Sequence, residues 1–367
     1  MSESITALHK VLKTAVTANA SDVHIKENCP VAFRIDGEMT SSDYVAKSEV
    51  IDEFMRQVAT EEQIKKYYIN GDLDLSHREP DVGRFRVNIH RQRNFNSINF
   101  RWVKNQIMTF DDLGLPPVLA DISMSQRGIV ILTGTTGSGK STTLAAMLDY
   151  INTQVHAHVI TIEDPIEYEF ADKLCFFEQR EVGIDTISFA SALKHALRQD
   201  PDVIMVGEMR DKASFEAALQ AADTGHLVMT TLHASNAAQT INRILDFYEK
   251  NEQEPIREAL ANNLKAVISQ RLVPRASGSG RAPATEIMIN TPIVNKLLEE
   301  DRLERLSAAI AAGRGDGMMT FNQCLLDLVN NGIVTEDDAL VVSDNPEALK
   351  MNFEGIFLSA GDNQIIG

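Results

Sequence analysis

Residues Gly134 to Thr142 have the types and the spacing that are needed to hold the phosphates of a nucleotide. They read GTTGSGKST and match the pattern G-x-x-x-x-G-K-[ST] at every fixed position. Glycines let backbone N–H groups converge on phosphate oxygens, and a helix that begins here adds the positive end of its dipole. Lys140 can reach the β- and γ-phosphates, and the Ser141 hydroxyl is a ligand for Mg²⁺. The segment therefore predicts binding of ATP and Mg²⁺, with a glycine-rich turn that binds nothing as the alternative. The predicted binding residues are Gly134, Thr135, Thr136, Gly137, Ser138, Gly139, Lys140, Ser141 and Thr142.

A carboxylate follows a short apolar strand in the segment DPDVIMVGEMRD. The strand Asp202 to Val206 places Glu208 at the carboxyl end of the sheet, where open α/β folds bind their ligands. We expect Glu208 to hold Mg²⁺ through water. Because carboxylates after strands also cap the next helix, a purely structural role is the alternative.

A second acidic pair, Glu163 and Asp164, follows the apolar strand in HVITIEDPIEYEF. If Glu208 serves the metal ion, Glu163 is free to polarise the water that attacks the γ-phosphate. We therefore predict Glu163 as the general base. For Asp164, which precedes a proline, turn formation explains the sequence nearly as well.

Two histidines, His226 and His233, flank the apolar segment between them at a separation of seven residues. An extended chain points such residues to opposite faces, so the pair does not chelate one metal ion. His233 lies at the carboxyl end of the strand, where we expect it to sense the γ-phosphate. His226 fits equally well as a buried structural histidine.

The elements that position these residues change in character along the chain. Residues 1–103 mix alternating strand patterns with helical stretches, which predicts a small α+β domain. Residues 104–117 lose periodicity and contain Gly114, Pro116 and Pro117, so we interpret them as an interdomain linker that absorbs domain rotation. Residues 118–343 carry continuous apolar strands between helices, which predicts a mainly parallel sheet covered by helices. Residues 344–367 are predicted to form a flexible tail.

Composition excludes several classes of protein. The 367 residues are 44% hydrophobic and 24% charged, which is typical of a globular chain. The three cysteines, Cys29, Cys175 and Cys324, form no CxxC pair and predict reduced thiols in a cytosolic protein. No apolar run approaches the roughly 20 residues that a membrane span needs, and the first residues do not resemble a secretion signal. The net charge of −17 disfavours nucleic-acid binding unless a basic patch provides it.

Taken in order, the segments GTTGSGKST, ITIEDPIEY, VIMVGEMRD and TGHLVMTTLHASNA resemble four motifs of the secretion ATPases, the GspE/PulE/PilT family. The segments GRFRVN, TFDDLGLP and SQRLVPR fit as well, and the chain is most similar to type IV pilus retraction ATPases. The resemblance implies a RecA-like ATPase domain of the P-loop NTPase class, preceded by a PAS-like domain. It also implies a homo-hexameric ring at the cytoplasmic base of the pilus machine, peripheral to the inner membrane. Its further motif positions are Asp164, Arg210, His226 and Arg271.

Two departures select among the relatives. Extension-type ATPases usually carry a four-cysteine zinc module, which the three scattered cysteines do not provide. The principal retraction ATPase usually has an Ala-Ile-Arg-rich helix where this sequence reads TPIVNKLLEEDR. The resemblance therefore favours an accessory, PilU-type motor for pilus retraction and twitching motility. Its expected partners are a main PilT-like retraction ATPase and an inner-membrane, PilC-like platform protein.

Arginines are concentrated in the segment GRFRVNIHRQRNFNSINFRWV. In a ring they could reach a neighbour's nucleotide and neutralise charge on its γ-phosphate. The candidates for these arginine fingers are Arg84, Arg86 and Arg101, with Arg91 and Arg93 on the same hairpin. Interleaved Phe85, Phe95, Phe100 and Trp102 have the composition of a single-strand-binding platform, although strand alternation would send aromatics into the core. We rank a solvated face second and DNA contact third, so no nucleic-acid partner is expected.

The alternative functions are a DNA-stimulated RecA-fold translocase and a nucleotide-binding scaffold for another motor.

Overall fold

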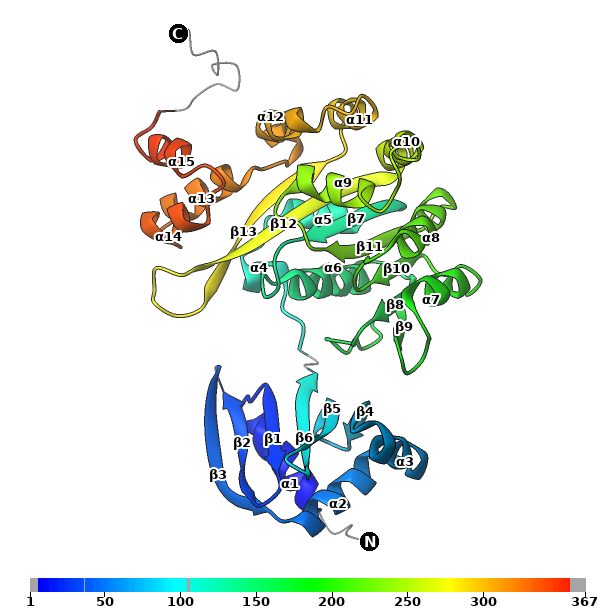
Figure 1. The fold of residues 1–367 in the computed structure, drawn as a ribbon. Helices are drawn as coiled ribbons and strands as arrows, with labels where there is room; N and C mark the ends of the chain where they lie inside the picture. The colour runs from blue at the N-terminus through cyan, green and yellow to red at the C-terminus, as the bar shows by residue number, and fades with distance from the viewer. Residues whose placement is uncertain (1–5, 36, 104–105, 357–367) are drawn as a thin grey trace. The chain divides into compact units, whose positions relative to one another are not determined.

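The computed structural model describes residues 6–35, 37–103 and 106–356 (Figure 1). Contacts divide the chain into two compact units. The first comprises Met1–Gln106 together with Pro165–Glu169, and the second comprises Ile107–Asp164 together with Phe170–Gly367.

The first unit is built on an antiparallel sheet with the strand order β3-β2-β1-β6-β5-β4. Its strands are β1 (Asp22–Lys26), β2 (Cys29–Ile35), β3 (Glu38–Ala46), β4 (Asp72–Glu79), β5 (Gly83–Gln92) and β6 (Phe95–Val103). Its helices are α1 (Ala7–Thr17), α2 (Ser48–Val58) and α3 (Glu61–Asn70). The α+β pattern predicted for this part of the chain therefore corresponds to regular elements.

Alternation along β5 separates a buried face of this sheet from a polar face. Phe85 and Val87 are fully buried and pack in one cluster with Leu8 of α1 and Phe54 of α2. Arg86 lies between the two buried residues, so its side chain belongs to the opposite face. Helices thus cover the apolar face, and Arg84 and Arg86 belong to the other one.

The second unit is built on a sheet with the strand order β13-β12-β7-β11-β10-β8-β9. Its strands are β7 (Gly128–Thr133), β8 (His158–Glu163), β9 (Phe176–Glu181), β10 (Val203–Val206), β11 (Leu227–Leu232), β12 (Leu264–Pro274) and β13 (Arg281–Ile289). All neighbouring pairs are parallel except β12 and β13, which form an antiparallel hairpin. The prediction of an α/β fold with a mainly parallel sheet is confirmed.

Helices cover both faces of this sheet because the chain crosses it in two directions. The connection from β7 through α6 (Lys140–Gln154) runs toward β8, whereas the later connections run back toward β12. Since such crossovers are right-handed, α6 lies on one face and the later helices on the other. These later helices are α7 (Phe189–Ala196), α8 (Lys212–Asp223), α9 (Ala237–Leu245) and α10 (Gln253–Asn263).

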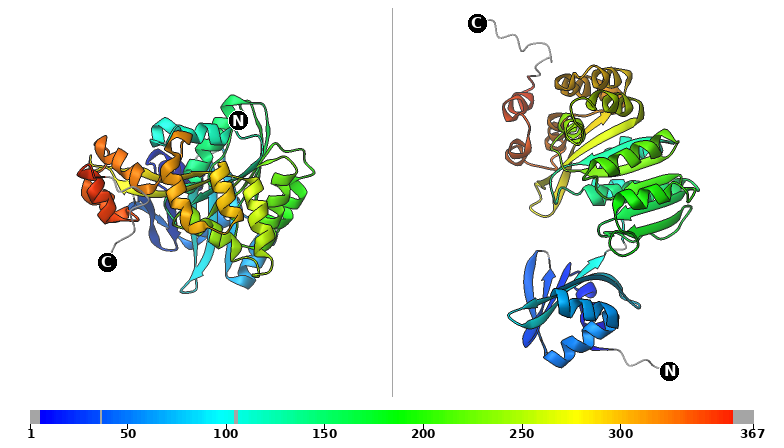
Figure 2. Two further views of the ribbon diagram at one scale, coloured as in Figure 1. Left: turned by 90° about the horizontal axis from the view of Figure 1, so that it is seen from above. Right: turned by 45° about the vertical axis from the view of Figure 1, so that its right-hand side comes forward.

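A series of small helices follows the β12–β13 hairpin, and the last three of them pack on it (Figure 2). The helices of this series are α11 (Pro292–Glu299), η1 (Leu303–Arg305), α12 (Leu306–Ala312), η2 (Gly313–Asp316), α13 (Phe321–Asn330), α14 (Glu336–Val342) and α15 (Pro346–Phe353). The prediction of a flexible tail from Asp344 is wrong for α15, because Asn345 caps this helix and Leu349 is fully buried. The remainder of the predicted tail, 357–367, lies outside the described residues.

The predicted linker, 104–117, is also shorter than expected. Its residues 104–105 lie outside the described residues, and Ile107 already belongs to the second unit. A capping box between Thr109 and Asp112 starts α4 (Phe110–Leu113), and the Phe110 ring lies 5.3 Å from the Tyr150 ring. Helix α5 (Val118–Ser123) follows directly. The segment from Thr109 is therefore folded onto α6, because local capping and the contact between two half-buried rings outweigh its glycine and prolines.

Two further properties concern the whole described chain. No helix within the described ranges combines the length and the apolar character that a bilayer span requires. Cys29, Cys175 and Cys324 are free thiols.

Candidate nucleotide-binding site

The phosphate loop connects the fully buried strand β7 to the first turn of α6. Gly134 and Gly139 have φ angles of 147° and 89°, which disfavour residues with side chains. A Cβ atom at Gly134 would lie 2.4 Å from the Gln270 carbonyl oxygen, and one at Gly139 would lie 2.7 Å from Gln270 Nε2. The loop is therefore pressed against β12 and keeps the open backbone cradle that phosphate groups need.

Gln270 is a site residue that the sequence reasoning missed. It is buried, its Nε2 donates a hydrogen bond to the Ser138 carbonyl at 2.8 Å, and its Oε1 accepts one from Thr143 Oγ1 at 2.7 Å. These bonds fasten the phosphate loop and the start of α6 to β12. The residue lies within the segment SQRLVPR, but nothing in its own type pointed to this contact.

Lys140 has little exposure to solvent, at 9%, although its ammonium carries a full charge. Its Nζ donates to the carbonyl oxygens of Gly134 at 2.8 Å and Thr135 at 3.0 Å. The charge thus lies inside the curve of the loop, where phosphate oxygens would neutralise it. Ser141 follows in the first turn of α6, so the residues that the motif supplies fit a nucleotide with its metal ion.

Three further groups follow the phosphate loop along the same edge of the sheet. The strand order β7-β11-β10-β8 places the loop, His233, Glu208 and Glu163 one after another at the carboxyl ends of parallel strands. The register supports this order, because Val206 of β10 lies opposite Ile162 of β8. The structure therefore brings the predicted catalytic residues to one edge.

Glu163 is the most buried of these acids, with 5% exposure. Thr161 Oγ1 donates a hydrogen bond to its Oε1 at 2.6 Å, and Gln179 Nε2 donates to the same oxygen at 3.3 Å. These donors fix the orientation of the carboxylate, which is what a general base requires.

Glu208 is the centre of an ionic cluster. His233 Nε2 lies 3.3 Å from its Oε1, and Arg210 Nε donates to its Oε2 at 2.8 Å. Arg210 also lies 3.9 Å from Asp164, so the cluster joins the ends of β8, β10 and β11. The hydrogen bond with Glu208 raises the pKa of Arg210, which keeps this guanidinium charged.

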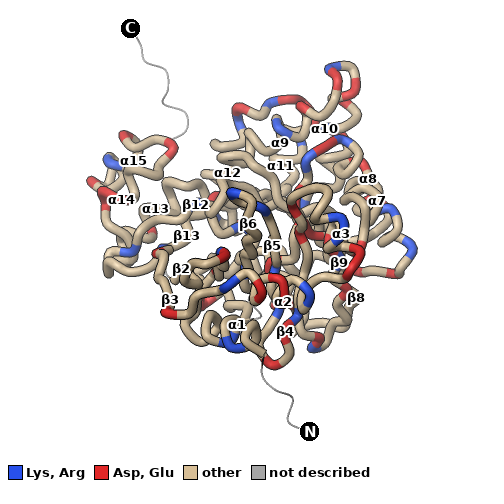
Figure 3. Tube along the Cα trace, turned by 60° about the horizontal axis from the view of Figure 1, so that its bottom comes forward, with Lys and Arg blue, Asp and Glu red and all other residues tan. Residues whose placement is uncertain are grey.

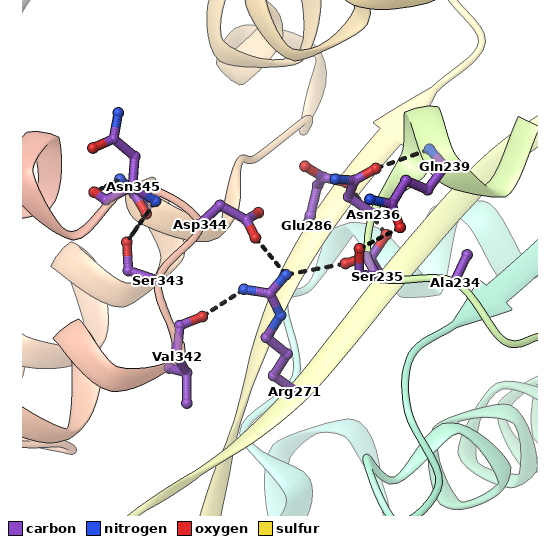
Figure 4. Close-up of polar contacts among 12 residues, drawn as sticks. Ala234, Ser235, Asn236, Gln239, Arg271, Glu286, Val342, Ser343, Asp344 and Asn345 are labelled. Atoms are coloured by element: carbon purple, nitrogen blue, oxygen red, sulfur yellow. Dashed lines mark hydrogen bonds and ion pairs between the residues drawn. The ribbon is translucent and has the colours of Figure 1, made fainter. Parts of the chain in front are cut away.

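The structure does not bring two of the predicted motif positions, His226 and Arg271, to the phosphate loop. His226 precedes β11, and its carbonyl accepts the Gly128 N–H at the start of β7, which is the opposite edge of the sheet. Its Nδ1 lies 2.9 Å from the Ala221 carbonyl, in keeping with the structural alternative. Arg271 follows Gln270 on β12 and contacts Ser235 and the C-terminal helices instead (Figure 4).

A cavity of about 410 Å³ adjoins the phosphate loop within the second unit. Its lining includes the start of α6 and apolar side chains from α4 and the β12–β13 hairpin: Leu113, Gly139, Thr142, Leu272 and Pro283. A concave, largely apolar space beside a phosphate site suits the base of a nucleotide.

Figure 3 marks Lys and Arg along the chain trace, and alternation along β5 places Arg84 and Arg86 on the face opposite Phe85 and Val87. Arg86 and Arg101 are direct cross-strand neighbours on β5 and β6. Arg101 Nε donates to Asp22 at 2.8 Å, and Arg84 Nε donates to Ser76 Oγ at 2.8 Å. The three predicted finger candidates therefore share one end of the hairpin.

The remaining parts of the hairpin give little support to a nucleic-acid platform. Phe85 and Phe100 are fully buried, so their faces are not available to stack on bases. Arg91 packs on the rings of Tyr67 and Tyr68, with its guanidinium carbon 5.8 Å and 5.4 Å from their centroids.

Among the described residues, no group of three or more His, Cys, Asp or Glu side chains is arranged to hold a metal ion. The two residues predicted to serve Mg²⁺ lie at this edge of the sheet, Ser141 in the first turn of α6 and Glu208 just after β10.

Comparisons with known proteins agree with this geometry. Residues 2–322 match the family model described as type II/IV secretion system protein. The chain is 40% identical to the type IV pilus retraction ATPase PilT of Pseudomonas aeruginosa, over 92% of this chain and 98% of that protein. It is 37% identical to the type IV pilus ATPase PilU of the same organism, over 93% and 90%. A crystal structure of the pilus retraction motor PilT with bound ADP superposes with a TM-score of 0.86 at 41% identity, over 93% of this chain and 98% of that one.

Proposed function

The chain belongs to the type II/IV secretion system protein family, and we propose that it is an ATP-hydrolysing motor that powers retraction of type IV pili. One observation carries the ATPase part of this proposal. The phosphate loop, His233, Glu208 and Glu163 follow one another at the carboxyl ends of four adjacent parallel strands. The pilus part is supported by the similarity to retraction ATPases along nearly the whole chain.

Each group at this edge has a distinct task in hydrolysis. The loop amides and Lys140 hold the phosphates and stabilise charge on the oxygens of the γ-phosphate. Glu163, oriented by Thr161, accepts a proton from the attacking water. Ser141 and Glu208 would hold Mg²⁺, which supplies further charge neutralisation when it is bound.

His233 connects the state of the phosphate to the neighbouring strand ends. Its ring touches Glu208, so a change at the γ-phosphate reaches the Glu208–Arg210 pair through one contact. The ring is about half exposed, so a ligand at this edge can reach it. We assign to His233 the sensing of the γ-phosphate.

The proposed active form is a ring of six identical subunits. In such a ring Arg84, Arg86 and Arg101 complete the nucleotide site of the adjacent subunit. Support comes from their shared end of the hairpin and from the exposure of Arg101, whose side chain is 67% accessible. Closure of the ring and rotation of the domains would then convert hydrolysis into mechanical work.

We further propose an accessory, PilU-type role beside a main, PilT-like retraction ATPase. The identities of 40% and 37% are similar, so this assignment rests on the sequence of the α11 region, Thr291 to Arg302. The motor would act at the cytoplasmic base of the pilus machine on a PilC-like platform protein of the inner membrane.

A deletion strain scored for pilus retraction, with and without the main motor, tests the proposal. Wild-type protein should restore retraction that is lost or weakened by the deletion, and Lys140→Ala should not. Lys194→Ala, at an exposed position of α7, is the matched control and should restore it. Full restoration by Lys140→Ala would contradict the motor function, and an unchanged deletion strain in both backgrounds would contradict the role in retraction.

A further inference from the structure

Arg271 lies beside Gln270 on β12, and the two side chains point to opposite faces of the sheet. Gln270 holds the phosphate loop, as described above. Because neighbouring residues of a strand alternate, Arg271 reaches the other side, where the loop after β11 meets the C-terminal helices (Figure 4). One dipeptide of β12 thus contacts two different loops of the nucleotide site.

The loop after β11 carries His233 and is fastened at successive residues. Thr133 Oγ1 donates to the Ala234 carbonyl and accepts the Ala234 N–H, both at 2.9 Å. Arg271 Nη2 donates to the Ser235 carbonyl at 3.1 Å, and the buried Glu286 carboxylate accepts the Ala237 N–H at 2.7 Å. Glu286 also accepts a hydrogen bond from Ser269 of β12, whereas Arg271 also bonds to the segment between α14 and α15.

The same guanidinium holds the connection between α14 and α15. Its Nη2 donates to Asp344 Oδ1 at 2.6 Å, and its Nη1 donates to the Val342 carbonyl at the end of α14. A cation at the carboxyl end of a helix is favourable, and the guanidinium carbon also lies 3.9 Å from the centre of the Phe321 ring. Asp344 is 43% exposed, so this connection can be reached and altered from outside.

We propose that Arg271 is a positioning residue for ATP hydrolysis. Through Ser235 it fixes the loop that presents His233, and through Val342 and Asp344 it makes that position depend on docking of the C-terminal helices. The inference rests on the proposed function. It predicts that removing the bond between Arg271 and Asp344 slows hydrolysis, although Asp344 does not contact the nucleotide.

Steady-state hydrolysis by the full-length protein with Mg²⁺ tests this role. Arg271→Ala should lower kcat by about tenfold and leave the KM for ATP within about twofold, because the Gln270 side of β12 is intact. Asp344→Ala should give a smaller loss of about threefold in kcat. Arg314→Ala is the matched control, since it removes another arginine bond to the same helices, 2.7 Å to Asp327 of α13, that does not reach the loop.

A double-variant cycle separates positioning from simple loss of packing. If Arg271 acts through His233, Arg271→Ala should lower kcat by less than about twofold in a His233→Ala background. Losses that multiply, or an equal loss in Arg314→Ala, would overturn the proposal.

Hydrogen exchange in the presence of ADP provides a readout that does not require hydrolysis. The amides of 234–237 should exchange faster in Arg271→Ala and Asp344→Ala than in wild type or Arg314→Ala. Unchanged exchange would refute the positioning role while leaving the ATPase in place. If the two variants exchange faster but the wild-type protein hydrolyses no ATP, the proposed function is refuted and the contact made by Arg271 is retained.

Discussion

The sheets of both units carry charged residues, but they hold them in different ways. In the second unit, Lys140 at the start of α6 and Glu163 at the end of β8 have 9% and 5% exposure. In the first unit, Arg101 is 67% exposed, and its ion pair with Asp22 lies on the polar face of an antiparallel sheet. Buried groups are fixed by their own fold, whereas a guanidinium that is two-thirds exposed keeps much of its contact with water. The difference fits our proposal that the second unit holds the nucleotide and that the arginines of the first unit act on another chain.

Lys140→Ala should have the largest effect on ATP turnover. The loop would lose the ammonium that its phosphates need, and we expect turnover to fall by at least about 10³-fold. The midpoint of thermal unfolding should shift by no more than about 4 °C, because β7 and α6 keep their packing. Coupled-enzyme measurement of ADP release and a melting curve check both expectations. Normal turnover would place the active site elsewhere.

Glu163→Gln separates ATP binding from hydrolysis at the buried edge of the second unit. The amide keeps the size of the side chain but cannot accept a proton from water, so kcat should fall by about 10²–10³-fold. The dissociation constant of a fluorescent ATP analogue should remain within about threefold. A wild-type rate in this variant would mean that a different group serves as the base.

Thr109→Ala should have the smallest effect. It tests whether the second unit already begins at this residue. Loss of the capping box should destabilise the second unit by about 1 kcal/mol in denaturant unfolding, with little change in kcat. Thr60→Ala is the matched control, because it removes the capping box of α3 in the first unit. If Thr109→Ala leaves the unfolding of the second unit unchanged, the segment behaves as the hinge that its glycine and prolines suggested.

Local patterns predicted the phosphate loop and the strands around it well. The predicted strands Gly128 to Thr133 and Val159 to Glu163 agree with β7 and β8 within one residue at each end. The reason is that buried parallel strands read as continuous apolar runs, and the residues after them share one edge of the sheet. Glu163 and Glu208 could therefore be placed without a structure.

Contacts between distant residues could not be predicted in the same way. Gln270 bonds to Thr143 across 127 residues, and Arg271 bonds to Asp344 across 73. Neither side chain belongs to a local pattern, since their partners are set by the register of β12 against β7 and by docking of the last helices. His226 shows the converse, because a motif position proved to lie at the far edge of the sheet.

The central claim is that the nucleotide edge of one chain is completed by arginines of another. The direct measurement is ATP turnover of an equal mixture of Lys140→Ala and a chain with both Arg86→Ala and Arg101→Ala. In randomly mixed rings about a quarter of the interfaces combine an intact phosphate loop with intact arginines. Turnover of the mixture should therefore exceed the average turnover of the two separate variants. The control is a chain with Lys140→Ala, Arg86→Ala and Arg101→Ala together. Mixed with the Lys140→Ala chain, it should add no ATP turnover. Turnover of the mixture equal to the average of the separate variants would contradict the claim.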